Sequence, residues 1–243
     1  MAAGAGASAR SAGASAEPAA GAGAAGPDLS APTTFVLLRH GETALTGEQR
    51  FSGSGGSDPA LSQQGRAQAA LAARALTAGP AVGLPAGTRV QAVVSSPLAR
   101  CRETAAAAAL LLGVDVTVEQ GLRETDFGAW DGLTFAEVRE RYPAEMADWL
   151  GSPSAAPPGG ESFDQVADRV AQARDALLSA HRGRTVLLVS HVTPIKTLVR
   201  LALGAPPEAL FRMHLSPASL TAIAYYGDGN VSVRYVNATA HLG

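Results

Sequence analysis

The sequence predicts a three-layer α/β/α sandwich with a mostly parallel sheet, and three observations support this fold class. From about residue 33 onward, short apolar runs typical of buried strands alternate with longer amphipathic stretches typical of helices. Loops rich in proline, glycine and serine interrupt the pattern, for example at 152–160. Strands that alternate with helices favour parallel pairing and a sheet covered on both faces. We see no internal repeat and therefore expect one domain spanning residues 33–243.

Six apolar or alternating runs predict the strands. They cover 34–38, 90–94, 114–118, 185–190, 220–226 and 231–236, with a Gly-Asp-Gly turn between the last two. Apolar residues at helical spacing predict the helices. These cover 62–77, 97 to about 112, 135–141, 143–150, 162 to about 181, and 193 to about 204.

Capping residues mark several of the expected helix ends. Ser62 stands at the start of the first helix, and Ser96 precedes a proline at the first position of the second. Ser162 and Gln165 have the spacing of a capping box. Gly204 closes the last helix, because glycine readily adopts the left-handed conformation that ends helices.

Residues 1–32 differ from the rest of the chain. Of these, 27 are alanine, glycine, serine or proline, with almost no large apolar side chain. Such a segment buries too little surface to offset its ordering entropy, so we expect a disordered tail or linker. A secretory signal is disfavoured, because the segment lacks a compact apolar centre and Arg10 is its only positive side chain.

The composition excludes several classes of partner. A formal net charge of −2 provides no basic field for nucleic acid, and no apolar run reaches the ~18 residues of a membrane span. The single cysteine, Cys101, permits no internal disulfide, which suits a reducing, cytoplasmic location. The expected partner is a small molecule, and the oligomeric state stays open.

Polar side chains follow three of the predicted strands. Arg39 and His40 end the first, Arg100 follows the second, and His191 follows the 185–190 strand. Because ligands of open α/β sheets bind beyond the carboxyl ends of the strands, these side chains are expected to converge. Guanidinium groups would repel a divalent cation but pair bidentately with phosphate oxygens. We therefore expect a phosphate site with no metal. Two alternatives are disfavoured, namely that the two histidines bind a metal and that they have only a structural role.

An ordered series of motifs resembles the histidine phosphatase (phosphoglycerate mutase-like) superfamily along essentially the whole domain. The motifs are Leu38-Arg39-His40-Gly41-Glu42-Thr43, Arg50-Phe51-Ser52-Gly53, Leu61-Ser62-Gln63-Gln64-Gly65, Ser95-Ser96-Pro97-Leu98-Ala99-Arg100, Glu103-Thr104-Ala105, Leu122-Arg123-Glu124, Gly128-Ala129-Trp130-Asp131-Gly132 and Val189-Ser190-His191. Segment 127–132 looks closer still to α-ribazole phosphatases. Segment 189–196 looks especially like the acid phosphatase half of bifunctional ribonuclease H–acid phosphatase proteins.

The resemblance implies a cofactor-independent phosphatase. His40 would accept the phosphoryl group, while Arg39, Arg100 and His191 hold its oxygens. Glu124 would protonate the leaving alcohol and then activate water. A neutral imidazole is a competent nucleophile, and the flanking arginines should lower the pKa of His40. Activity is then expected to favour mildly acidic pH, where the acid is protonated and His40 is neutral.

Some positions depart from the family pattern. Thr46 stands where many members have asparagine, and Ser52 stands where glutamine often precedes the glycine, here Gly53. We expect Thr46, Ser52 and Gly53 to contribute to phosphate binding. Val192 replaces the glycine that commonly follows the second histidine.

Phosphatase activity is favoured over two alternatives. The Thr125-Asp126-Phe127-Gly128 segment lacks the basic pair that cofactor-dependent mutases of the superfamily usually carry there, and losing cations near the site favours hydrolysis. Phosphoglycerate mutase-type transfer remains an alternative that would need Arg139 and Arg141 as replacement cations, whereas a solvated helix face is the favoured interpretation of these two residues. A non-catalytic phosphate-binding module is the other, although the expected catalytic residues are intact. The natural substrate, a small phosphorylated metabolite, is left open.

Overall fold

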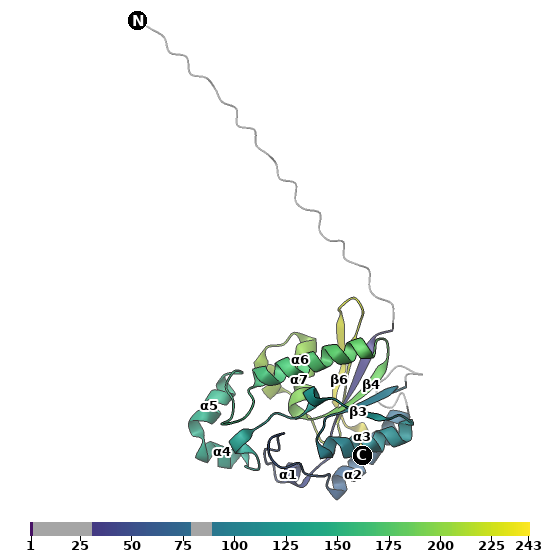
Figure 1. The fold of residues 1–243 in the computed structure, drawn as a ribbon, viewed down its shortest axis with the longest axis horizontal. Coiled ribbons are helices and arrows are strands. Elements are labelled where there is room, and N and C mark those ends of the chain that lie inside the picture. Colours follow the sequence, from purple (N-terminus) through teal and green to yellow (C-terminus); the bar gives the residue numbers. More distant parts are fainter. Residues whose placement is uncertain (2–30, 79–88) are drawn as a thin grey trace.

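A computed structural model describes residue 1, residues 31–78 and residues 89–243 (Figure 1). The expected tail at 1–32 lies outside the described residues, apart from its first residue and its last two. Within the described ranges, no helix is both long enough and apolar enough to cross a membrane.

Six strands form one sheet in the order β3-β2-β4-β1-β5-β6. The first four run parallel to one another, whereas β5 pairs antiparallel with both β1 and β6. The short turn between β5 and β6 forces this last pairing, because a parallel pair needs a long crossover. The strands are β1 Thr33–Arg39, β2 Ala92–Ser95, β3 Val116–Val118, β4 Thr185–Ser190, β5 Leu220–Tyr225 and β6 Val231–Ala238.

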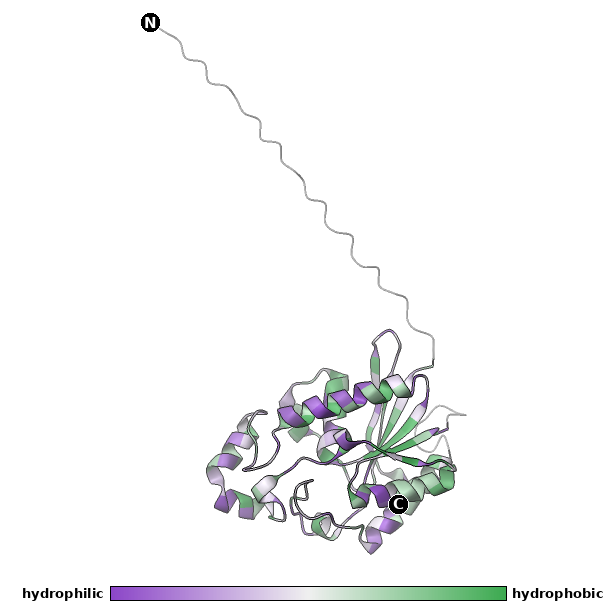
Figure 2. Ribbon diagram, in the orientation of Figure 1, coloured by the Kyte–Doolittle hydropathy of each residue, from purple (hydrophilic) through white to green (hydrophobic). Residues whose placement is uncertain are grey.

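Helices cover both faces of the sheet, as the alternation of elements predicted (Figure 1). Val36 and Leu38 of β1 pack in one apolar cluster with α2 and α3, while Phe35 and Leu37 pack in another with α6 and α7. Successive strand residues point to opposite faces, so one apolar run serves both clusters. The strands accordingly form an apolar centre between helices with polar outer faces (Figure 2). The α-helices are α1 Ala44–Gly47, α2 Gln63–Thr77, α3 Ala99–Leu112, α4 Phe135–Arg141, α5 Pro143–Gly151, α6 Phe163–Ala180 and α7 Val192–Leu203.

A third apolar cluster lies beside the two layers, where α4 and α5 form one end of the molecule (Figure 1). It is centred on the buried side chains of Trp130, Met146 and Trp149. The 3₁₀ helices are η2 Gln120–Leu122, η3 Gly128–Trp130, η4 Pro207–Arg212 and η5 Ala240–Leu242. Both η3 and η4 contribute to this cluster, which forms one side of the site described below.

Two expected helix starts are wrong by one or two residues. Helix α3 begins at Ala99 and not at the proline, because the Ser96 hydroxyl hydrogen-bonds His191 Nε2 at 2.7 Å. The carboxylate of Asp58 instead accepts from the Ala99 backbone N–H, at 2.9 and 3.0 Å. Helix α7 begins at Val192, one residue early, with His191 at its N-cap position. The capping box of α6 and the left-handed Gly204 after α7 are confirmed.

Candidate active site

The two histidines at the strand ends lie side by side. His40 directly follows β1 and His191 directly follows β4, and these strands are neighbours in the sheet. The ring centroids are 5.0 Å apart at an interplanar angle of 60°, and both side chains are buried. The parallel register of β1 and β4 thus brings together two residues that are 151 positions apart in the sequence.

The protonation of His40 follows from its surroundings. Its Nδ1 lies 2.7 Å from the Gly41 carbonyl oxygen. A carbonyl only accepts, so Nδ1 carries the proton and Nε2 keeps its lone pair. Burial, followed by the charges of Arg39 and Arg100, lowers the pKa of His40 well below its ordinary value. At neutral pH the imidazole is therefore uncharged, with Nε2 free to act as a nucleophile.

Gly41 is required by close backbone packing. A Cβ at Gly41 would collide with the Gly65 backbone, and a Cβ at Gly65 would collide with the backbone of Glu42. Because both positions exclude a side chain, the loop after β1 lies directly against the start of α2. This contact fixes the backbone that holds the His40 ring.

The buried Arg100 and the partly buried Arg39 supply positive charge next to the histidines. Arg39 Nη1 donates to the Leu215 carbonyl at 2.6 Å, and burial lowers the Arg39 pKa to about 10, so it stays protonated at pH 7. Arg100 Nη2 donates to the carbonyls of Ser52 and Gly53, at 2.9 and 3.3 Å. Arg39 Nε and Arg100 Nε are buried without a hydrogen-bond partner, and Arg100 Nη1 makes no hydrogen bond but lies 3.6 Å from the Asp58 carboxylate. Buried unpaired donors are costly, and an anion satisfies them.

His191 is completely buried and is held by two side chains. Its Nε2 lies 2.7 Å from the Ser96 hydroxyl and 3.3 Å from Cys101 Sγ. Burial, followed by the charges of Arg100 and other neighbours, lowers the pKa of His191 well below its ordinary value. Burial also raises the pKa of Cys101 above the usual range, so the thiol stays protonated and packs against the imidazole.

Glu124 lies on the wall of the cavity that also contains Arg39 and His40. Its Oε1 accepts hydrogen bonds from the backbone N–H groups of Thr125 and Thr193, at 2.8 and 3.3 Å. The Thr193 donor belongs to the first turn of α7, where free N–H groups carry partial positive charge. Glu124 is therefore held between its own loop and the helix that follows His191.

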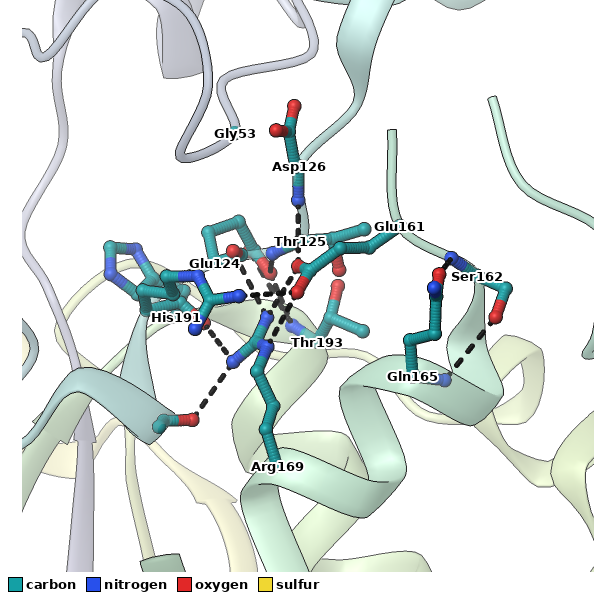
Figure 3. A network of polar contacts seen from close by, with 12 residues as sticks. Gly53, Glu124, Thr125, Asp126, Glu161, Ser162, Gln165, Arg169, His191 and Thr193 are labelled. Atoms are coloured by element: carbon teal, nitrogen blue, oxygen red, sulfur yellow. Dashed lines mark hydrogen bonds and ion pairs between the residues drawn. The ribbon is translucent and has the colours of Figure 1, made fainter. Parts of the chain in front are cut away.

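A buried ion pair holds the backbone on both sides of Glu124 (Figure 3). Arg169 of α6 donates to both carboxylate oxygens of Glu161, at 2.9 and 3.0 Å. The same guanidinium donates to the carbonyls of Gly121, Arg123 and Glu124, at 2.8, 2.8 and 3.1 Å. We call this pair the Glu161–Arg169 clamp. The sequence analysis did not predict this pair, because no spacing rule connects Arg169 with carbonyls 45 to 48 residues away.

Thr46, Ser52 and Gly53, which were expected to contribute to phosphate binding, differ in whether they line the cavity and in whether their polar groups already have a partner. The Thr46 hydroxyl lies 3.1 Å from that of Thr43 in the capping box of α1, and both residues line the cavity. Ser52 also lines the cavity, and its buried hydroxyl has no hydrogen-bond partner. Gly53 does not line the cavity. Its N–H donates to the Asp131 carboxylate at 2.6 Å, so it serves the site through its carbonyl, which accepts from Arg100.

In the part of the chain that the structure describes, no group of His, Cys, Asp or Glu side chains is arranged to hold a metal ion. The cavity has a volume of about 560 Å³. Arg39, His40, Ser52 and Glu124 all line it, and most of its remaining lining is apolar. Arg100 and His191 lie beneath this surface, in contact with the residues that form it.

Comparison with known proteins agrees with this geometry. A family model of the histidine phosphatase superfamily, branch 1, matches residues 35–238. A bifunctional protein of Mycobacterium tuberculosis is 49% identical over 211 residues, which are 87% of this chain and 55% of that protein. This chain thus spans about half the length of that relative. Phosphoserine phosphatase 1 of Hydrogenobacter thermophilus is 31% identical over 210 residues, covering 86% of this chain and 94% of that enzyme.

A solved structure gives the same result at the level of the fold. A mycobacterial glucosyl-3-phosphoglycerate phosphatase, in complex with vanadate, superimposes with a TM-score of 0.74 at 30% identity. The match covers 85% of this chain and 100% of that enzyme. The family resemblance carried by the sequence motifs is therefore confirmed, and the chain belongs to the histidine phosphatase superfamily, branch 1.

Proposed function

We propose that the chain is a metal-independent phosphomonoester hydrolase that carries a phosphoryl group on His40. The single observation that carries this proposal is the state of the His40 ring. Its Nδ1 proton is bound to the Gly41 carbonyl, its Nε2 is free, and it lies beside the guanidinium groups of Arg39 and Arg100, whose buried Nε atoms have no hydrogen-bond partner.

In the first step, Nε2 of His40 attacks phosphorus and the bond from phosphorus to the ester oxygen breaks. Protonated Glu124 donates its proton to the departing alkoxide, so a neutral alcohol leaves. Arg39 and Arg100 offset the charge that develops on the phosphoryl oxygens.

In the second step, water attacks the phosphohistidine while Glu124 takes up one of its protons, and the P–N bond breaks. The products are inorganic phosphate, neutral His40 and protonated Glu124, so the net reaction is ester plus water to alcohol plus phosphate. Two relatives named as phosphatases, for phosphoserine and for glucosyl-3-phosphoglycerate, support hydrolysis as the outcome.

The charge of the segment that follows Glu124 favours hydrolysis over phosphoglycerate mutase-type transfer. The segment after Glu124 contributes the carboxylate of Asp126 and no cation. Arg139 and Arg141 are exposed on α4 and do not line the cavity, so they do not replace the missing basic pair. A phosphate-binding module without catalysis is disfavoured, because His40 and Glu124 both open onto the same cavity.

Finer aspects of the function are also proposals. We place the catalytic domain at residues 33–243 and propose an acid phosphatase, because Glu124 must be protonated while His40 is neutral. The natural substrate is proposed to be a small phosphorylated metabolite. α-Ribazole 5′-phosphate is the first candidate to assay, since a putative α-ribazole-5′-phosphate phosphatase of Escherichia coli has a similar fold.

The direct test is release of phosphate from p-nitrophenyl phosphate at pH 5–7 with a chelator present. Wild type is expected to turn over, while His40→Ala is inactive and retains the circular dichroism spectrum of wild type. A folded but inactive wild type, or an active His40→Ala variant, would reject the proposed mechanism.

A further inference from the structure

The cavity onto which His40 opens is lined by many aromatic rings. Six of them, which we call the aromatic wall, line it: Phe51, Phe127, Phe135, Trp149, Phe163 and Phe211. The whole chain contains only six phenylalanines and two tryptophans. Five of those phenylalanines and one of the tryptophans therefore surround this one cavity, in a chain that is only 5% aromatic.

The rings of the aromatic wall contact one another. The centroids of Phe51 and Phe127 are 4.8 Å apart, as are those of Trp149 and Phe163. Trp149 meets Phe51 edge-on at 6.3 Å, and Phe211 meets Phe163 edge-on at 5.5 Å. These separations are typical of favourable aromatic pairs, so the wall is one continuous surface and not a set of isolated side chains.

Two rings of the wall are not part of the buried core. Phe135 and Phe211 are 47% and 48% exposed, whereas Phe127, Trp149 and Phe163 are buried. Phe135 is the first residue of α4 and Phe211 lies in η4, so the two half-exposed rings come from separate segments. Large apolar side chains in this state leave ring faces available for a ligand.

The charged residues of the cavity wall are mostly engaged elsewhere. Arg50 donates to Glu48, to Glu137 and to the Gly132 carbonyl. Lys196 Nζ donates to the Leu210 carbonyl at 2.9 Å. Arg39 directly precedes His40 in the sequence. Thr43, Thr46, Gln49 and Thr193 also line the cavity, and the larger part of its lining is apolar, so it offers a leaving group more apolar contact than hydrogen bonds.

We propose that the aromatic wall is the binding site for the leaving alcohol, and that it selects phosphomonoesters whose alcohol carries a planar aromatic ring. Phe135 and Phe211 are the specificity-determining residues. This inference rests on the proposed function, because the phosphate of the same ester must reach His40. A volume of about 560 Å³ is within the range of cavities that hold a phosphate and a ring system together.

The test compares esters that share a primary alkoxide leaving group and differ only in the attached group. These are 2-phenylethyl phosphate, 2-cyclohexylethyl phosphate, propyl phosphate and O-phosphoserine. We expect kcat/KM for 2-phenylethyl phosphate to exceed that for propyl phosphate by roughly 10- to 100-fold, the effect of burying one aromatic side chain. The cyclohexyl ester is expected between them, because it is apolar but cannot pair with the rings as an aromatic group does.

Two variants test the assignment of residues. Phe135→Ala and Phe211→Ala are each expected to raise KM for 2-phenylethyl phosphate about fivefold or more, while propyl phosphate changes less than about twofold. Leu203→Ala is the matched control, because Leu203 is 60% exposed on α7 and lies outside the cavity. It is expected to change neither substrate.

Three results would overturn the proposal. The first is equal kcat/KM for the phenyl and propyl esters, and the second is equal kcat/KM for the phenyl and cyclohexyl esters. The third is that O-phosphoserine is the best substrate and that Lys196→Met lowers kcat/KM for O-phosphoserine alone. Failure of the proposed function shows separately, as absence of p-nitrophenyl phosphate turnover. In that case, calorimetric binding of the same esters to His40→Ala decides the ring preference without any reaction.

Discussion

Substitution of Arg169 by glutamine removes the guanidinium of the Glu161–Arg169 clamp without touching the phosphate site. Five hydrogen bonds are lost, two to Glu161 and three to the carbonyls of residues 121, 123 and 124. The Glu161 carboxylate keeps Arg123 and the Asp126 N–H as partners, which reduces the cost of leaving it unpaired. The substitution therefore acts on the position of the Glu124 loop and on the stability of the fold.

The expected magnitude follows from this geometry. Breaking a buried ion pair costs about 3–5 kcal/mol, and the Arg169 and Glu161 side chains are only 12% and 15% exposed. The retained partners of Glu161 favour the lower end, so we expect a loss of about 3 kcal/mol in unfolding free energy. A catalytic group misplaced by about 1 Å costs on the order of 10²-fold in rate.

The assay varies the leaving group. It thereby distinguishes a displaced Glu124, which slows only reactions that need a protonated leaving group, from damage to the whole active site, which slows every reaction. An alkyl phosphate needs its departing alkoxide protonated, whereas p-nitrophenolate leaves readily as an anion. Arg169→Gln is therefore expected to lower kcat for 2-phenylethyl phosphate by about 10²-fold, and kcat for p-nitrophenyl phosphate by less than about threefold. Arg174→Gln is the control, because Arg174 lies on the same helix and forms its ion pair with Asp175, at 2.7 Å, away from the Glu124 loop. Equal losses for both substrates in Arg169→Gln would refute a positioning role.

Four further predictions concern the site itself. Arg100→Lys is expected to lower kcat/KM, measured by steady-state kinetics, by roughly 10²-fold, because the lysine ammonium cannot replace the planar set of guanidinium donors. An unchanged kcat/KM would count against a contact between Arg100 and phosphate. Ser96→Ala removes the hydroxyl partner of His191 and is expected to cost about 1–3 kcal/mol in urea unfolding; no loss would mean that the hydrogen bond is not formed. The folded-state pKa values of His40 and His191 are both depressed, so the unfolded chain binds protons more readily below about 6.5 and stability falls as the pH drops. Each histidine contributes a loss approaching about 1.4 kcal/mol per pH unit, so urea unfolding should show a smaller pH dependence in His40→Asn than in wild type. Prolonged dialysis against a chelator is expected to leave kcat unchanged, and loss of activity restored by a divalent metal would contradict the metal-free mechanism.

Much of the fold could be predicted because the strands that matter most are unambiguous. The apolar runs of β1 and β4 are buried on both faces, and their ends place His40 and His191 where ligands of such sheets bind. Capping signals also worked where the cap is local, as at Ser162. The start of α3 failed because its cap is not local. Asp58, 41 residues earlier, accepts from Ala99, while the expected cap Ser96 turns toward His191.

The residues that sequence reasoning missed act across long sequence separations. Arg169 reaches carbonyls 45 to 48 residues away, so no spacing rule connects it with Glu124. The aromatic wall draws on positions from 51 to 211, and a phenylalanine in each segment looks like an ordinary core residue when taken alone. Gly53 was expected to bind phosphate, but Asp131 occupies its N–H, a contact that only the folded chain reveals.

The most direct test of the central claim is to look for the phosphohistidine itself. Wild type is mixed with a phosphomonoester for a single turnover, quenched in alkali to preserve a phosphohistidine, digested and analysed by mass spectrometry. We predict one phosphorylated peptide, with the phosphoryl group on His40, which forms and decays at rates that account for kcat and is absent from His40→Ala. Full turnover with no phosphorylated His40 at any time point would contradict the account.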